Sequence, residues 1–392
     1  MRKIFFLVIV LISTHTLKAQ ENFRYARTTG KLPMMAYSLG EDRLGSAKMN
    51  IIDTNILIKI IDSTNNMYLV QLAKNHTAYL EKKYTKLLET TQLKNVYLTN
   101  AFTVKPIADS FDLVSINLTE KLPYKIWMEA NPNKIMLQLY GVQSNTNWIN
   151  QYTNTKAIKN MYFNQTEDDV VTVTIDLSTK QHWGFSTAYH QNTLRIKVKH
   201  TPKPSLENLV IAIDAGHGGT NFGTVGSNSK VLEKDYTLLF AKALETVLLK
   251  QGATVIMTRT TDTTFDNKDR ILFLQQHNPD LLISLHLNAS VKPEIQGVST
   301  YYKQIGFKPL SVSILKRMLD TGLKEFGNIG NFNFTLNAIT DFPNCLVEIG
   351  FLSNKEDEEK ILNPKFHQKV AQSIYWGIKD FLKNSKDMSA KN

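Results

Sequence analysis

The chain has few of the features that crosslink a protein or anchor it in a membrane. Its 392 residues include one cysteine, Cys345, so no disulfide can form within the chain. A lipoprotein needs a cysteine where its leader is cleaved, and none stands there. The apolar run from Ile4 to Ile12 is far shorter than the ~20 residues that span a bilayer. Stability must come from buried cores, and we expect Cys345 to be a small buried residue rather than a nucleophile.

The sequence also lacks the motifs of nucleotide-binding loops. The glycine-rich stretch DAGHGGTNFGTVG (214–226) contains neither G-x-G-x-x-G nor G-x-x-x-x-G-K-[ST]. The formal net charge is +11, with the excess mainly upstream of residue 208, but no dense basic stripe is present. We therefore expect no nucleic-acid partner. The basic upstream region fits either an anionic surface such as cell-wall polymer or a merely solubilising charge.

Residues 1–19 have the pattern of a secretory signal peptide. Arg2 and Lys3 precede the short apolar run, and the small residue Ala19 offers a cleavage point. We expect an exported protein without a transmembrane anchor. The periplasm is the predicted compartment, or the cell wall and medium if the cell has no outer membrane.

Two β-rich regions are predicted before residue 201. Short strand-like segments over 40–90 resemble the SH3-like barrels of exported cell-wall proteins. Over 95–200 the segments alternate apolar and polar residues, which predicts an antiparallel sandwich. That region resembles the amidase N-terminal type of module, which targets enzymes to the cell wall; a structural spacer is the alternative. Three tryptophans could form a sugar-stacking face, although core filling is the expected use of at least two: Trp127, Trp148 and Trp183.

The pattern changes after a proline-containing linker at 201–207. Apolar strands then alternate with amphipathic helices over 208–384, which predicts a doubly wound, mostly parallel α/β sheet flanked by helices. One of these helices is predicted over 309–327 and a closing helix ends near 384. Residues 385–392 are predicted to be a flexible tail.

Four polar residues follow or end the predicted strands of this last region. His217 follows the first strand, His286 and Glu348 end later strands, and Glu233 precedes the first helix. Ligands in open α/β sheets gather outside the carboxyl ends of the strands. Two histidines and a carboxylate make a catalytic zinc site, and the remaining carboxylate can act as general base. Spacing alone does not decide between Glu233 and Glu348. His277 and His367 are expected to be structural.

At these residues the sequence resembles zinc-dependent N-acetylmuramoyl-L-alanine amidases of the amidase-3 type. The matching segments occur in the family's order: IDAGHGG (213–219), LEKDYTL (232–238), DLLISLHLNAS (280–290), GVSTYY (297–302) and LVEIGFLSN (346–354). The resemblance implies one zinc ion held by His217, Glu233 and His286, with Glu348 as the catalytic base. Asn288 and Arg270 match positions that the family keeps polar, which implies a supporting role.

The resemblance implies hydrolysis of the amide between N-acetylmuramic acid and L-alanine of peptidoglycan, in cell-wall remodelling or daughter-cell separation. Two alternatives stay open: a zinc carboxypeptidase or endopeptidase acting on the stem peptide, and a non-catalytic peptidoglycan-binding protein. The family's inserted blocking helix has little room, because only 62 residues separate His286 from Glu348. We therefore expect an uncovered site, no obligatory activator and a monomer whose partner is peptidoglycan.

Overall fold

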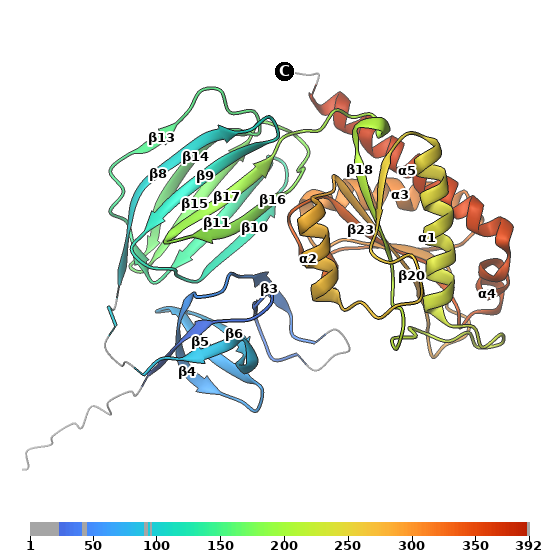
Figure 1. Ribbon diagram of the computed structural model, residues 1–392, viewed down its shortest axis with the longest axis horizontal. Helices are drawn as coiled ribbons and strands as arrows, with labels where there is room; N and C mark the ends of the chain where they lie inside the picture. The colour runs from blue at the N-terminus through green and yellow to red at the C-terminus, as the bar shows by residue number, and fades with distance from the viewer. Residues whose placement is uncertain (1–22, 41–44, 90–92, 95, 390–392) are drawn as a thin grey trace, which may run out of the picture.

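A computed structural model describes residues 23–40, 45–89, 93–94 and 96–389 (Figure 1). The predicted signal peptide at 1–19 lies outside this part of the chain. Three units follow one another: an antiparallel β unit, a β sandwich, and an α/β unit that carries all five α-helices of the described residues. Within the described residues, no helix combines the length and hydropathy that crossing a membrane requires.

The first unit is a seven-stranded antiparallel sheet. Its strand order is β3-β2-β6-β5-β4-β1-β7. It begins at Arg24, so the predicted start at residue 40 is wrong; β1 pairs with β4, and alternate residues of β1 are buried. The strands are β1 Arg24–Thr28, β2 Met34–Ala36, β3 Lys48–Ile51, β4 Leu57–Ser63, β5 Met67–Ala73, β6 His76–Glu81 and β7 Thr85–Leu87.

The second unit consists of two facing sheets. One has the order β10-β11-β15-β14, and the other β12-β8-β9-β17-β16 with β13 added beside β8. Alternate residues of these strands are buried, as expected for sheets with one wet face. The strands are β8 Tyr97–Ile107, β9 Phe111–Leu118, β10 Tyr124–Glu129, β11 Lys134–Tyr140, β12 Val142–Gln143, β13 Ile149–Gln151, β14 Ile158–Glu167, β15 Val170–Leu177, β16 Phe185–His190 and β17 Thr193–Lys199.

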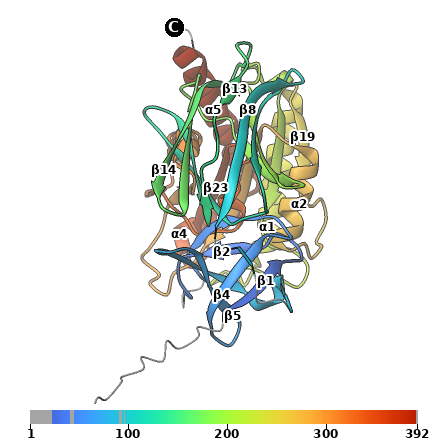
Figure 2. The same cartoon turned by 90° about the vertical axis from the view of Figure 1, so that its left-hand side faces the viewer.

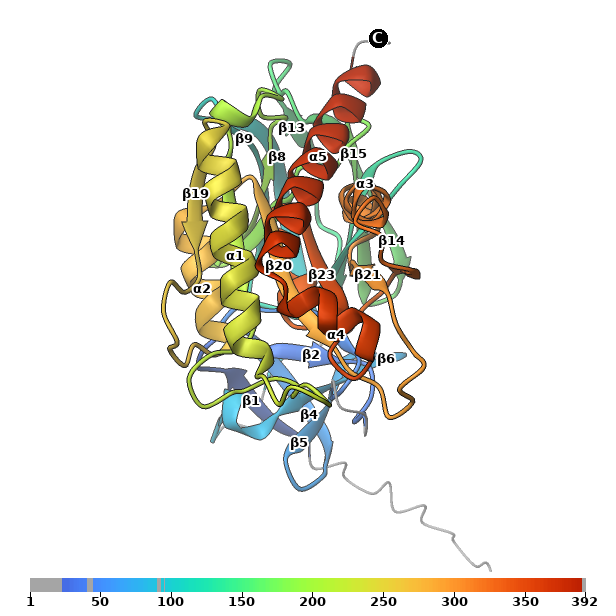
Figure 3. The ribbon, with the colours of Figure 1, turned by 90° about the vertical axis from the view of Figure 1, so that its right-hand side faces the viewer.

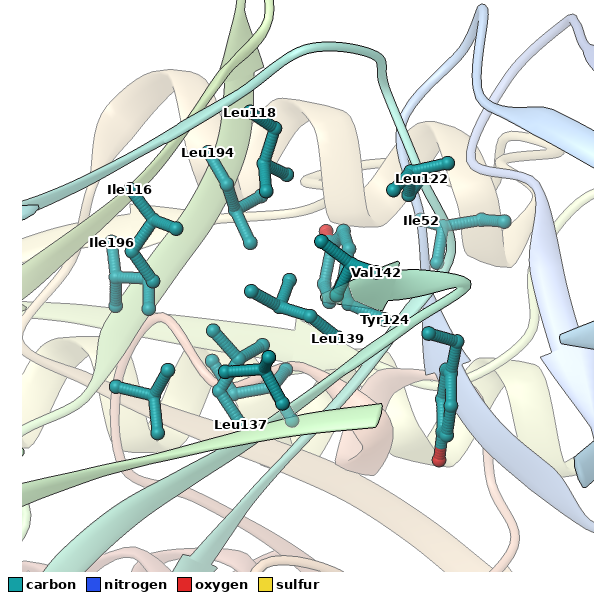
Figure 4. Packing of buried hydrophobic residues seen from close by; sticks show 14 of the residues in the cluster. Ile52, Ile116, Leu118, Leu122, Tyr124, Leu137, Leu139, Val142, Leu194 and Ile196 are labelled. Carbon is teal, nitrogen blue, oxygen red and sulfur yellow. The ribbon is translucent and has the colours of Figure 1, made fainter. Parts of the chain in front are cut away.

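The two β units share one hydrophobic core. Ile52 of the first unit belongs to the same buried cluster as Leu122, Tyr124 and Leu139 of the sandwich (Figure 4). Phe307 of the third unit also joins this cluster. Turned by 90°, the first unit lies below both the sandwich and the α/β unit (Figure 2). The three units therefore pack against one another rather than hanging on open linkers.

The third unit is a six-stranded sheet with the order β19-β18-β20-β23-β21-β22. Neighbouring strands are parallel except for the β23–β21 pair. The strands are β18 Val210–Ala215, β19 Thr254–Met257, β20 Leu281–Asn288, β21 Val298–Tyr301, β22 Glu325–Ile329 and β23 Asn344–Phe351, and the helices are α1 Glu233–Lys250, α2 Asn267–His277, α3 Lys308–Leu319, α4 Lys355–Leu362 and α5 Pro364–Ser389.

The helices cover the two faces of this sheet unequally. α1, α3 and α5 bury apolar residues on one face (Figure 3), whereas α2 packs with a smaller apolar cluster on the other. Two helix boundaries differ from expectation. The helix predicted over 309–327 ends at Leu319, because Gly322 takes a positive φ of 85° and Glu325–Ile329 forms β22. The predicted tail lies partly in α5, where Ser385 is buried and donates to the Phe381 carbonyl.

Other expectations meet mixed outcomes. Cys345 is buried in β23, as predicted, and burial raises its thiol pKa. His367 is buried in α5 and contacts the Ile361 carbonyl, while His277 is exposed and contacts the carbonyl of Phe273. Of the tryptophans only Trp183 fills a core, against Phe381 of α5; Trp148 is 62% exposed and Trp127 is half-buried. The expectation that at least two fill the core is therefore wrong.

Candidate metal centre

The four predicted site residues line one cavity of about 450 Å³ at the carboxyl-end edge of the sheet. His217 follows β18, Glu233 is the first residue of α1, and His286 and Glu348 lie in neighbouring strands β20 and β23. Residues spread over 132 positions of sequence thus meet because parallel strands end at the same edge.

Three of these residues bring ligand atoms to one point. His217 Nε2 lies 3.0 Å from Glu233 Oε1, and His286 Nδ1 lies 3.1 Å from the same oxygen. One ligand atom from each of the three residues fits within a 4.8 Å group. The second ring nitrogen of His286, Nε2, is buried and has no hydrogen-bond partner among the described residues. This donor set, with a buried unsatisfied imidazole nitrogen, fits a divalent metal ion.

Neighbouring groups hold the ligand atoms in place. Thr224 N donates to Glu233 Oε2 at 2.7 Å, and Leu287 N donates to Oε1 at 2.9 Å. Asn221 Oδ1 lies 2.9 Å from His217 Nδ1, which leaves Nε2 of that ring facing Glu233. Such outer contacts fix ring orientation and tautomer in metal sites.

The electrostatics of the cluster favour a charged Glu233. Burial disfavours the carboxylate, but the contacts with His217 and His286 outweigh burial and lower its pKa. Burial likewise disfavours a charged His217, yet its contact with Glu233 raises the histidine pKa. The cluster therefore has a carboxylate ready to bind a cation.

Glycines allow the histidine-bearing loop to fold this closely. His217 has a left-handed φ of 61°, and Gly218 and Gly219 follow with φ of 127° and 56°. A Cβ on Gly216 would lie 2.4 Å from the ring of His286, and one on Gly223 would lie 2.4 Å from Glu233 Oε2. The glycines therefore make room for side-chain ligands, and no phosphate cradle is needed to explain them.

Arg270, which was expected to have a supporting role, contacts this loop from behind. It is buried, its Nη2 donates to the His217 carbonyl, and its Nη1 pairs with Asp214. Burial disfavours the Asp214 carboxylate, but Arg270 and Ser284 hold its pKa at about 2. Asn288 lines the cavity, accepts from Ala289 N at 2.8 Å and donates to the Tyr301 hydroxyl at 3.5 Å.

Sequence reasoning missed several residues around the site. Arg259, at the end of the β19 segment, donates to the carbonyls of Ala215 and Gly216 at 2.9 Å each. Two signals in the sequence could have revealed this network: Arg259 closes a strand-like segment, and Asp214 is an acidic residue inside an apolar strand. Phe332 and Phe334 form another part of the cavity wall, and the Phe334 ring lies 5.6 Å from that of His286.

The loop with these phenylalanines is tied to the first β unit. Asn333 Oδ1 accepts from Lys48 N at 2.9 Å, and its Nδ2 donates to the Ser46 carbonyl at 2.9 Å. Lys48 Nζ in turn donates to the Asn333 carbonyl at 2.8 Å. The described segment 289–343, which connects β20 to β23, contains the helix α3. This helix packs against α5, and none of its residues lines the cavity.

Comparison with known proteins places the α/β unit in a family. Residues 211–380 match the amidase-3 family model described as N-acetylmuramoyl-L-alanine amidase. A germination-specific N-acetylmuramoyl-L-alanine amidase of Bacillus subtilis is 34% identical over 192 residues, which cover 44% of this chain and 79% of that protein. A probable cell wall amidase, LytH of Staphylococcus aureus, is 30% identical over 209 residues, which cover 53% of this chain and 70% of that protein.

A solved structure also resembles a part of the chain. The catalytic domain of CwlV, an N-acetylmuramoyl-L-alanine amidase from Bacillus (Paenibacillus) polymyxa var. colistinus, is 32% identical and covers 45% of this chain and 98% of that one, with a TM-score of 0.43. From the family match and the extent of the Bacillus subtilis relative, the chain belongs to the N-acetylmuramoyl-L-alanine amidase family of the amidase-3 type.

Proposed function

We propose that this chain is a zinc-dependent amidase that hydrolyses the bond between N-acetylmuramic acid and L-alanine in peptidoglycan. The observation that carries the proposal is the convergence of His217, Glu233 and His286 around one point, in a cavity that Glu348 also lines. The named activity of the Bacillus subtilis relative supports the same reaction. The role we infer is cell-wall remodelling or daughter-cell separation.

Zinc is the metal that best suits the three ligands. Two imidazoles and one carboxylate form a typical catalytic zinc set, which leaves one coordination position for a reactant. When bound, zinc supplies Lewis acidity: it polarises a carbonyl oxygen and makes water more acidic. We assign His217, Glu233 and His286 as the ligands because their atoms converge, whereas Glu348 lies beside them in β23.

Glu348 then serves as the general base and acid. It takes a proton from the attacking water, whose oxygen bonds to the carbonyl carbon of the lactyl group. The same carboxyl group passes that proton to the L-alanine nitrogen as the carbon–nitrogen bond breaks. The products are a free lactyl carboxylate on the glycan and a stem peptide with a free amino terminus. Asn288, at the cavity edge, and Arg270, behind the loop, support the geometry.

We also propose where the protein works and how its parts contribute. Residues 1–19 would direct export, to the periplasm where an outer membrane is present. The two β units would serve the wall-bound enzyme as SH3-like and amidase-N-terminal-like modules. The catalytic cavity is open in this arrangement, which supports activity without an obligatory activator. The monomer stays a prediction.

The assignment of roles can be tested by measuring metal and activity together on the full chain. After chelation and reloading with zinc, the wild type should release peptides from purified peptidoglycan. Glu348→Gln should retain zinc and lose more than about 99% of activity, because only the proton carrier is removed. His217→Ala should lose zinc, while His277→Ala, an exposed histidine at the end of α2, should keep both zinc and activity. Loss of zinc from Glu348→Gln would contradict this assignment and indicate that Glu348 is a zinc ligand and Glu233 the general base.

A further inference from the structure

A second cavity, of about 390 Å³, lies where the three units meet. We name this cavity the junction cleft. Each unit supplies one aromatic residue and one lysine to its lining: Tyr37 and Lys48 from the first unit, Trp127 and Lys125 from the second, and Tyr302 and Lys303 from the third. We propose that the junction cleft binds the carboxylate-bearing stem peptide of a peptidoglycan strand whose scissile amide lies in the catalytic cavity. This inference rests on the proposed function and extends it to a second substrate-binding site.

The charge of the junction cleft favours an anionic ligand. Lys303 is half-buried, and no carboxylate of the described residues lies within salt-bridge distance of it. Burial lowers the pKa of Lys303, and the positive charge of Lys48 lowers it further. Lys303, a partly desolvated cation with no carboxylate of the described chain within salt-bridge distance, is stabilised when a carboxylate of a ligand approaches it.

The aromatic residues give the junction cleft faces for the rest of a peptide or sugar. Lys125 Nζ lies 5.3 Å from the ring centre of Tyr37 and 4.9 Å from that of Trp127. Trp127 Nε1 donates to Glu129 at 3.4 Å, and Lys125 lies over its ring. A polymer with alternating apolar and carboxylate groups matches this combination of aromatic faces and cations.

The junction cleft and the catalytic cavity share one loop. Gly330 and Asn331 line the cleft, and Phe332 and Phe334 line the catalytic cavity. Consecutive Cα atoms are only about 3.8 Å apart, so the two cavities lie on neighbouring parts of one short segment. Phe332 N donates to the Tyr302 carbonyl at 3.0 Å, which fixes that segment to the wall of the cleft. An extended ligand that followed this segment would pass from one cavity to the other, as the proposal requires.

Stem-peptide chemistry fits this arrangement. The peptide that begins at the scissile amide continues into residues with free carboxylates, so a substrate held at the metal centre must place negative charge beyond it. Lys303 and Lys125 offer the cations to receive that charge.

The test measures binding of a synthetic stem tetrapeptide with free carboxylates to the full chain by titration calorimetry. This peptide is a product of the proposed reaction, so its binding is measured whether or not the chain hydrolyses peptidoglycan. We expect Lys303→Gln and Lys125→Gln each to weaken binding about fivefold or more, because each removes one charge-assisted contact. Lys242→Gln, an exposed lysine of α1, is the matched control and should bind as the wild type does. The same peptide with its carboxylates amidated should bind the wild type at least as weakly as the free peptide binds the lysine variants.

Three results would overturn the inference. They are equal binding by Lys303→Gln and wild type, equal binding of the amidated and free peptides, and displacement of the peptide by equimolar inorganic phosphate, which would indicate a general anion site. A kinetic measurement complements the titration. For Lys303→Gln, the KM for a muramoyl tetrapeptide relative to that for muramoyl-L-alanine should rise about fivefold. If the wild type bound the tetrapeptide but hydrolysed neither substrate, the proposed function would fail while the binding site stood.

Discussion

His286 and Glu348 are register partners on the adjacent parallel strands β20 and β23. Partners in neighbouring strands lie about 4.8 Å apart and direct their side chains to the same face of the sheet. The register shifts just beyond this pair, between His286 and Asn288, so β23 bulges where the cavity opens. A proposed metal ligand and the proposed general base are thus placed side by side by the strands themselves.

Gly216 offers a direct test of how closely the metal centre is packed. A Cβ added by Gly216→Ala would lie 2.4 Å from Cε1 of His286, so the imidazole must move. We expect the purified variant to hold less than about half of the zinc of the wild type and to lose at least tenfold in activity, because ligand geometry is displaced. Metal analysis by mass spectrometry gives the zinc content.

Gly322→Ala is the control for this substitution. Its Cβ would meet open space, although its φ of 85° makes the backbone strained. It should lower stability and leave zinc content unchanged. Full zinc occupancy in Gly216→Ala would show that His286 does not bind the metal in this position.

Arg270 should prove essential to the stability of the loop that carries His217. Arg270→Gln leaves the buried Asp214 carboxylate without its cation and frees the His217 carbonyl, which should cost about 3–5 kcal/mol. Denaturation in urea, followed by circular dichroism, measures this loss. The double variant Arg270→Gln/Asp214→Asn should recover part of it, because no unpaired charge stays buried. A loss below about 1 kcal/mol would contradict the role assigned to Arg270.

Asn333 should transmit the position of the first β unit to the catalytic cavity. Asn333→Ala removes the side-chain contacts with Lys48 and Ser46, so Phe332 and Phe334 are held less firmly. We expect KM for peptidoglycan fragments to rise about threefold or more, with a smaller change in kcat. Asn160→Ala, an exposed position of β14, is the control. An unchanged KM in Asn333→Ala would show that the contact with the first unit does not affect substrate binding.

The pH dependence of stability should include a contribution from Asp341. Burial raises its pKa to about 6, although Gln275 donates to both of its oxygens at 3.3 Å. Between the unfolded pKa near 3.8 and the folded value, the native chain binds more protons than the unfolded chain. The contribution of this group is therefore fully present below pH ~4 and is lost as pH rises to 6, by at most about 3 kcal/mol.

Asp341→Asn should remove this component. Its melting temperature relative to the wild type should rise between pH 4 and pH 6 and stay level above that range. Thermal unfolding of both proteins at several pH values measures the difference. Parallel pH profiles for the two proteins would show that Asp341 ionises normally in the folded chain.

The sequence allowed the catalytic cavity to be predicted better than its surroundings. Histidines and acids at strand ends are local signals, because the carboxyl edge of a parallel sheet gathers them. Asn333 gave no such signal, and the strand-end position of Arg259 did not show which groups it would reach, since each acts through backbone groups brought near by the tertiary fold. The short strand β1 at Arg24–Thr28 was overlooked for a similar reason: five residues show little periodicity until β4 and β7 pair with them.

The contacts among the three units were also beyond the reach of sequence patterns. A pattern predicts that a strand has a buried face, but not which unit covers it. Trp127 shows this limit, because it fits a core strand by sequence and instead lines the junction cleft with residues of two other units.

The most direct test of the central claim is the identity of the bond that the full chain cleaves. Purified peptidoglycan is digested with the zinc-loaded chain, and the soluble products are analysed by mass spectrometry. The account predicts intact stem peptides that begin with a free L-alanine amino group, together with glycan whose lactyl groups carry free carboxylates. Stem peptides shortened at their carboxyl end or cut internally, with the lactyl amide intact, would contradict it and indicate a peptidase.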